Sequence, residues 1–279
     1  MKIPLGRFLL KKDSFRIILN TEAVQKAVRV VNKKMSLSTD GLIIKVNNVG
    51  EYNRAVSVLT ADKGIVHAFV HGARSVKNKH CAATALLSYS RLTFRKKGDT
   101  YTITESSPEK VFINLWDDIE KLTLAQHFCD LALALAPVED EAEEYFRLIL
   151  NSIALMADGK RDARLLKAVT ELRILSISGY TPDLVACRNC AKFEDEQMFF
   201  DPVNGELYCS ECRPATGGLI AIGNGVLTAM RHIIYSEFSD IYNFSLPEST
   251  LDVLSGVTER FLLSQVEHRF SALEFYKNL

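Results

Sequence analysis

Two strand-like runs and a turn make up Arg54-Ala-Val-Ser-Val-Leu-Thr-Ala-Asp-Lys-Gly-Ile-Val-His-Ala-Phe-Val70. Residues 54–60 and 65–70 are rich in β-branched and aromatic side chains, which favour extended backbone. The turn at 61–64 ends in glycine, which readily adopts the left-handed conformation that closes a hairpin. This stretch therefore predicts an antiparallel β-hairpin.

Three further strand-like runs surround this hairpin. Residues 42–46 precede it, and residues 91–95 and 101–104 follow it, separated from each other by a Lys-Lys-Gly-Asp turn. A longer break at 72–88 interrupts the series. Five short strands in a segment of this size suit a small closed barrel. We therefore expect an OB-fold domain over residues 35–107.

The periodicity changes to helical after Pro108. Large apolar residues recur at intervals of three and four, which is the spacing along one face of an α-helix. Helices are expected over residues 115–135, 145–157, 163–177, 225–237 and 250–270. Together they predict a helical domain over residues 108–279.

Four of the six cysteines form two CxxC pairs separated by eighteen residues. This spacing is typical of a zinc ribbon, in which two thiolates from each of two tight turns complete a tetrahedron. The expected ligands of one structural Zn²⁺ are Cys187, Cys190, Cys209 and Cys212, in a ribbon over residues 183–214. A redox CxxC motif and a metal-free cluster are the alternatives.

These patterns predict an α+β multidomain fold. An N-terminal five-stranded OB-like β-barrel is followed by an α-helical domain with an embedded four-cysteine zinc ribbon. The two remaining cysteines, Cys81 and Cys129, lie among apolar residues and are expected to be small core side chains.

The formal net charge of zero hides a strong asymmetry. Residues 1–34 carry +7, residues 35–107 carry +5 and residues 108–279 carry −12. The first block is an N-terminal extension that departs in composition from the rest and is weakly helical over 22–31. It is interpreted as a flexible basic arm, a transit-like segment, or the product of a start codon upstream of the true one at Met35.

Cations gather on the predicted barrel, in the break at 72–88 and around the last hairpin. Lysine and arginine side chains bind nucleic-acid phosphates by releasing counterions, and exposed aromatic rings can stack on unpaired bases. The candidate DNA contacts are Arg74, Lys77, Lys79, Arg91, Arg95, Lys96 and Lys97, with Tyr52, Tyr89, Phe94 and Tyr101 as candidate stacking rings. The alternative is that the charges are merely solvated and the rings fill the barrel.

The helix expected at 163–177 carries three cations beside apolar residues, in an otherwise acidic block. Arg164, Lys167 and Arg173 could receive an acidic peptide with an apolar tip. An amphipathic helix that faces the core, with a solvated polar side, is the competing interpretation.

The sequence also bears on catalysis and on export. The chain has no glycine-rich phosphate loop, Walker-type lysine or nucleophile elbow, so we expect a protein that is not an enzyme. Its apolar runs are shorter than the roughly 18 residues of a membrane span, and its first residues lack the apolar core of a signal peptide. With its free cysteines, these features favour the cytoplasm.

Several motifs in combination resemble the bacterial RecO recombinational repair proteins, over about residues 35–240. They are Gly41-Leu-Ile-Ile-Lys45, Gly50-Glu-Tyr-Asn-Arg54, Leu59-Thr-Ala-Asp-Lys-Gly64, Gly72-Ala-Arg74, Glu171-Leu-Arg-Ile-Leu175 and Gly179-Tyr-Thr-Pro182 before the first cysteine pair. The resemblance implies an OB-fold domain joined to a helical domain that contains the ribbon. Residues 1–34 have no counterpart in the family pattern.

The resemblance also implies a function. RecO proteins bind single- and double-stranded DNA, anneal complementary strands and work with RecR. They help to load RecA onto DNA coated with single-strand-binding protein, whose acidic C-terminal tail they can bind. Carried over to this chain, Arg54, Arg74, Lys77 and Lys79 become candidate DNA contacts, and Arg173 becomes a candidate contact for the tail.

We therefore expect a nucleoid-associated cytoplasmic mediator of DNA repair and recombination, which binds no membrane. Two other classes stay open at this point. The chain could be an RNA-binding zinc-ribbon factor of translation or transcription, which competition between DNA and RNA oligonucleotides would separate. It could also be a metalloenzyme, which would need an open metal site.

Overall fold

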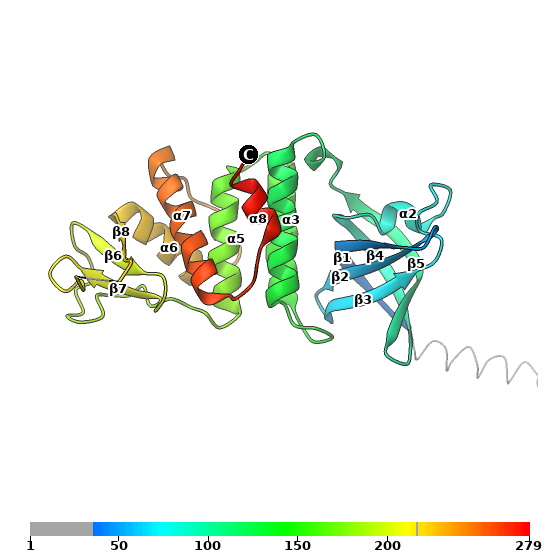
Figure 1. Ribbon diagram of the computed structural model, residues 1–279, viewed down its shortest axis with the longest axis horizontal. Helices are drawn as coiled ribbons and strands as arrows, with labels where there is room; N and C mark the ends of the chain where they lie inside the picture. The colour runs from blue at the N-terminus through cyan, green and yellow to red at the C-terminus, as the bar shows by residue number, and fades with distance from the viewer. Residues whose placement is uncertain (1–35, 216) are drawn as a thin grey trace, which may run out of the picture.

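The computed structural model describes residues 36–215 and 217–279. A β-barrel lies at one end, a bundle of helices in the middle and a small three-stranded sheet at the other end (Figure 1). The expectations for the basic extension at 1–34, its helix at 22–31 and a start at Met35 lie outside the described residues.

The barrel closes in the strand order β1-β2-β3-β5-β4, which confirms the five-stranded barrel. Its strands are β1 (Ser36–Val49), β2 (Asn53–Thr60), β3 (Gly64–Val70), β4 (Ser88–Lys97) and β5 (Thr100–Val111). The break before β4 contains one short helix, α2 (His80–Ala83). β3 and β5 close the barrel in parallel through two residue pairs, and the other neighbouring strands are antiparallel.

Two strands are longer than the sequence pattern indicates. β1 begins six residues before Leu42, because its polar first half pairs with β4 while its second half pairs with β2. β5 runs through Pro108 to Val111, and Pro108 lies opposite Ser90 beside an irregularity in the register. A proline is tolerated at such a position because the regular ladder is already interrupted there.

The barrel has a core of its own, built from side chains that point inward from all five strands. Phe94 is fully buried in it and Tyr101 is 8% exposed, with their rings in edge contact at 6.2 Å between centroids. Of the two interpretations that the sequence left open for these rings, Phe94 and Tyr101 therefore follow the second, because both fill the barrel and neither is free to stack on bases.

The helical part consists of α3 (Ile119–Leu135), α4 (Glu143–Ala157), α5 (Ala163–Ile177), α6 (Asn224–Tyr235), α7 (Glu248–Gln265) and α8 (Ser271–Tyr276). Asp118 and Asp162 cap α3 and α5 by accepting backbone N–H groups of the first turn. α5 lies in the centre, in contact with α3, α4, α6 and α7. The helix expected over 250–270 ends at Gln265, and α8 folds back onto α3 (Figure 1).

The cysteine segment lies between α5 and α6. Its strands β6 (Met198–Asp201), β7 (Glu206–Cys209) and β8 (Ile220–Ile222) form a sheet in the order β7-β6-β8. The carboxylate of Asp201 accepts the backbone N–H groups of Val203 and Asn204, which closes the β6–β7 turn. This hairpin brings the second cysteine pair back towards the first.

Backbone hydrogen bonds join the barrel to the helical part. The N–H of Ile65 donates to the carbonyl of Pro137 at 2.9 Å, and the N–H of Ala142 donates to the carbonyl of Ala61 at 2.8 Å. Leu42 and Leu59 of the barrel belong to the same apolar cluster as the helices. Among the described helices, none is long and apolar enough to cross a membrane.

Candidate nucleic-acid interface and metal centre

The four paired cysteines meet at one point. Their sulfur atoms all lie within 4.8 Å of one another, and the Sγ atoms of Cys190 and Cys209 are 3.7 Å apart. Four thiolates at about 2.3 Å from a tetrahedral zinc ion would be separated by roughly 3.8 Å. The cluster, completed by Cys187 and Cys212, can therefore hold one metal ion, as the spacing predicts.

Backbone hydrogen bonds favour the thiolate form of one of these cysteines, which is the form that binds a metal cation. Burial alone would raise the pKa of Cys187, but backbone N–H groups, those of Cys190 and Cys209 first, lower this pKa to about 6. Cys187 and Cys209 are buried and Cys190 is exposed. Four sulfur ligands leave no position for a water molecule on a tetrahedral ion, which is typical of a structural site.

The first group of barrel cations is the loop patch, which we define as Arg74, Lys77 and Lys79. All three side chains are exposed on the loop between β3 and α2. Arg74 is held at both ends, because its backbone N–H donates to the carbonyl of Tyr52 and Nη1 of its guanidinium group donates to the carbonyl of Gly50 at 2.7 Å. Tyr52 beside it is 57% exposed, so an aromatic ring borders the patch.

The second group is the hairpin patch, which we define as Arg95, Lys96 and Lys97. Arg95 and Lys97 are exposed, and the Nζ of Lys96 forms a salt bridge of 2.7 Å with Glu139. Arg95 pairs with Ser36 at the start of β1, whereas Arg74 contacts Gly50 just beyond the end of β1. The two patches therefore lie at opposite ends of the barrel, as the positions of α2 and the β4–β5 turn indicate (Figure 1).

Two other predicted DNA contacts have partners in the protein. Arg91 is exposed but forms a salt bridge of 2.8 Å with Asp40. Arg54 is half-buried, and its Nη1 donates to the carbonyl of Cys81 at 2.8 Å, while its Nε is buried without a hydrogen-bond partner among the described residues. Arg54 thus holds the segment before β4 and is not part of either patch.

The three cations predicted to form a peptide-binding patch do not share a surface. Lys167 is 1% exposed, so its place in an exposed patch is a wrong prediction. Arg164 forms salt bridges with Asp162, Glu248 and Asp252. Arg173 donates from Nη1 to the carbonyls of Ile233 and Ile234 at the end of α6.

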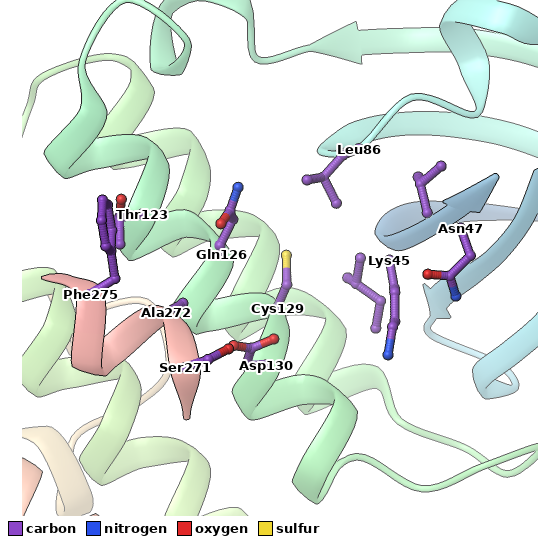
Figure 2. Close-up of a pocket in the computed structure, with 12 residues that line it drawn as sticks. Lys45, Asn47, Leu86, Thr123, Gln126, Cys129, Asp130, Ser271, Ala272 and Phe275 are labelled. Atoms are coloured by element: carbon purple, nitrogen blue, oxygen red, sulfur yellow. The ribbon is translucent and has the colours of Figure 1, made fainter. Parts of the chain in front are cut away.

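A pocket of about 390 Å³ lies between the barrel and the helices, beside the apolar contact that joins them. Lys45 lines it from β1, Cys129 and Asp130 from α3, and Phe275 from α8 (Figure 2). Burial raises the pKa of Asp130, and the N–H of Ala272 donates to its carboxyl group. No member of the loop patch or the hairpin patch is among the lining residues, so the cavity is separate from both.

Sequence reasoning missed two groups of residues that the fold brings together. Glu139 is forty-three residues away from Lys96, and no local pattern indicates that they meet. His127 and Glu171 are fully buried and paired at 3.0 Å, although the spacing suggested only core-facing helices. The i, i+4 relation of Lys167 and Glu171 was the one available signal, and it is equally typical of exposed pairs.

Comparisons with known proteins cover both parts of the chain. Residues 35–112 match the family model of the recombination protein O N terminus, and residues 117–274 match that of its C terminus. A protein named DNA repair protein RecO from Acetivibrio thermocellus is 31% identical over 243 residues, which are 87% of this chain and 97% of the relative. One of the same name from Symbiobacterium thermophilum is 27% identical over 87% of this chain and 97% of its own length.

Proposed function

Since this chain belongs to the RecO family of DNA repair proteins, we propose that it is a non-enzymatic mediator of recombinational repair. It binds single- and double-stranded DNA, anneals complementary strands and, with RecR, assists the loading of RecA on DNA coated with single-strand-binding protein. Annealing makes and breaks no covalent bond. It requires neutralised phosphates and bases that stay accessible for pairing.

The observation that carries this proposal is the loop patch. Its three cations are exposed, and neither Lys77 nor Lys79 has a carboxylate partner among the described residues. The backbone N–H of Arg74 is held by Tyr52 and its guanidinium group by the carbonyl of Gly50, so the loop presents this charge from a defined position. Phosphates would replace the counterions of this patch, and each replacement makes binding more sensitive to salt.

The first test reverses the charge of the loop patch in one variant, with Arg74→Glu, Lys77→Glu and Lys79→Glu. Affinity for a single-stranded oligonucleotide should fall at least about tenfold. The slope of log K against log salt should become shallower by roughly 2, because each lost phosphate contact on a single strand contributes about 0.7. Fluorescence anisotropy over a salt series measures both quantities.

The matched control reverses three exposed cations on the helical part, Lys160, Arg260 and Arg269. It changes the net charge equally and should leave affinity nearly unchanged. Equal losses in both variants would assign the effect to overall charge, and an unaffected loop variant would refute the loop patch as the DNA contact.

The mediator activity needs its own measurement. Complementary strands coated with single-strand-binding protein should anneal faster with the protein present, and RecR should change that rate. No acceleration, with or without RecR, would contradict the proposal. The acidic C-terminal tail of single-strand-binding protein stays a proposed partner, but Arg164 and Arg173 already have partners within the protein.

The cysteine cluster is proposed to hold one structural Zn²⁺. We expect one zinc per chain with four sulfur ligands in X-ray absorption spectra, and loss of the metal with a lower unfolding temperature in Cys187→Ser. Cys81→Ser is the matched control, because Cys81 lies on α2 and outside the cluster. A water oxygen in place of one sulfur in the spectrum would indicate an open site and favour a metalloenzyme.

A further inference from the structure

Two hydrogen-bond donors of the barrel converge on one carboxylate oxygen. The Nζ of Lys96 lies 2.7 Å from Oε2 of Glu139, and the hydroxyl of Tyr101 donates to the same oxygen at 3.2 Å. The ammonium also lies 4.7 Å from the centroid of the Tyr101 ring. Lys96 and Tyr101 therefore form an anion site, which a side chain of the protein itself occupies.

The surroundings of this site favour negative charge. Lys96 shares the hairpin patch with the exposed Arg95 and Lys97. The hydrogen bond from Lys96 is the main cause that lowers the pKa of Glu139, and Lys63 adds a smaller contribution from the β2–β3 turn. The same hydrogen bond raises the pKa of Lys96. Both groups stay charged at neutral pH, so the site holds a full anion.

Glu139 is brought to the barrel by its backbone. Its N–H donates to the carbonyl of Ile65 at 3.3 Å, and the neighbouring Val138 forms isolated β-bridges with Gly64 and Ile65. Glu139 adopts a φ of 56°, a conformation that is uncommon for a residue with a side chain. These backbone contacts between the β2–β3 turn and the α3–α4 loop therefore fix the position of the Glu139 carboxylate.

The pair remains open to solvent. The side chain of Lys96 is 40% exposed and that of Glu139 is 43% exposed, and ion pairs of this kind are weak because water and salt screen them. An incoming anion with two acceptor oxygens can therefore compete with Glu139 for the same two donors. A phosphodiester has these oxygens and carries the same single charge as the carboxylate.

We propose that Lys96 and the hydroxyl of Tyr101 form a phosphodiester subsite for nucleic acid, and that Glu139 fills this subsite until a strand displaces it. The inference rests on the proposed DNA-binding function and adds a second contact at the end of the barrel opposite the loop patch. Glu139 acts as an internal competitor that lowers affinity for DNA. Strand binding at the hairpin would thereby release a contact between the barrel and the α3–α4 loop.

The experiment measures binding of the full chain to a thymidine oligonucleotide over a salt series. Glu139→Gln removes the competing charge and keeps the shape of the side chain. Affinity should rise about two- to fivefold, and the salt slope should steepen by about 0.7, the value for one additional phosphate on a single strand. Lys96→Gln should abolish this gain when it is combined with Glu139→Gln.

The matched control is Glu141→Gln, on the same loop. Glu141 is exposed, and its carboxylate forms no salt bridge among the described residues. It should leave the slope unchanged. An equal gain in both variants, no gain from Glu139→Gln, or a gain that persists without Lys96 would each overturn the inference. If the unaltered protein shows no salt-dependent binding at all, the proposed function fails with it.

Discussion

Lys167 has its ammonium group inside the helical bundle. Its Nζ lies 3.1 Å from carboxylate oxygens of both Glu171 and Glu259, and it donates to the carbonyl of Ser255 at 3.2 Å. Glu171 also accepts one hydrogen bond from the hydroxyl of Thr258 and is hydrogen-bonded to Nε2 of His127. The sequence position of Lys167 suggested that it binds a partner. In the structure it instead balances two acidic groups between α5 and α7.

This network predicts a large effect of Lys167→Met at neutral pH. Removing one partner of a buried ion pair leaves the other charge uncompensated, so the free energy of unfolding should fall by about 3–5 kcal/mol. Urea denaturation at pH 7 measures the loss. Lys160→Met is the control, because Lys160 pairs with Asp158 on the surface and should cost less than about 1 kcal/mol.

The loss of stability caused by Lys167→Met should depend on pH. Burial by itself would raise the pKa of Glu171, but the charge of Lys167 and the hydrogen bond of His127 outweigh it and lower this pKa. A carboxyl group whose pKa is lower in the folded state stabilises the fold at pH values above its unfolded pKa, near 4.3. This contribution is lost as the pH falls through the pKa of the folded state. The difference between the protein and Lys167→Met should therefore shrink as pH falls below about 5, and a constant difference would argue against an ionised Glu171.

At the scale of elements, the β2–β3 turn is the contact that positions the barrel. Gly64 has a φ of 52°, and a Cβ atom added there would lie 2.1 Å from the carbonyl oxygen of Pro137. Only glycine allows both this conformation and this approach. The turn that closes the predicted hairpin is thus also the point where the helical part is attached.

Gly64→Ala should therefore destabilise the protein by about 2–4 kcal/mol, from an unfavourable φ of about 1 kcal/mol and a steric term of about 1–3 kcal/mol. Gly98→Ala separates the two causes. Gly98 has a φ of 60° in the β4–β5 turn, but nothing lies within 4 Å of its added Cβ, so it should cost only about 1 kcal/mol. Thermal unfolding of both variants tests this, and equal losses would mean that the contact with Pro137 is unimportant.

Most elements could be predicted from local pattern, and the exceptions share one cause. α5 has the expected bounds of Ala163–Ile177, because its period and its ends are encoded within the helix. The start of β1 was missed because Ser36 and its neighbours become a strand by pairing with β4, about fifty residues later. α8 was merged with α7 because the break after Gln265 depends on where α8 packs against α3.

At the scale of the whole molecule, the barrel and the helices share one apolar cluster, which includes Leu42, Leu59 and Leu87 from the barrel side and most of the helices. The backbone bonds of Ile65 and Ala142 cross the same boundary. A barrel that separated from the helices would expose this surface to water. The two parts are therefore expected to depend on each other for stability.

We expect a single unfolding transition for the described parts together. Circular dichroism at 222 nm reports the helices, and the fluorescence of Trp116, the one tryptophan of the chain, reports the junction after β5. The two signals should give the same urea midpoint, which is the test of two-state behaviour. Two separated midpoints would show that the junction after β5 and the helices unfold in separate steps.

The charge distribution over the whole molecule bears on where nucleic acid can bind. The barrel segment carries +5 and the helical segment −12, and the two lie side by side in an elongated molecule (Figure 1). The acidic part repels a polyanion, so contacts with nucleic acid should concentrate on the barrel. The net charge of zero gives no hint of this division.

Local residue patterns were enough to predict the strand and helix periods, the spacing of the four cysteines and the family, because each depends on residues that are close together or on a fixed order of motifs. Which charged and aromatic groups are buried and which are exposed depends on how these elements pack. The tertiary structure buried Phe94, Tyr101 and Lys167 and left Arg74 exposed. It also placed Glu139 on Lys96. Burial and pairing depend on neighbours that are distant along the chain, and no local pattern carries that information.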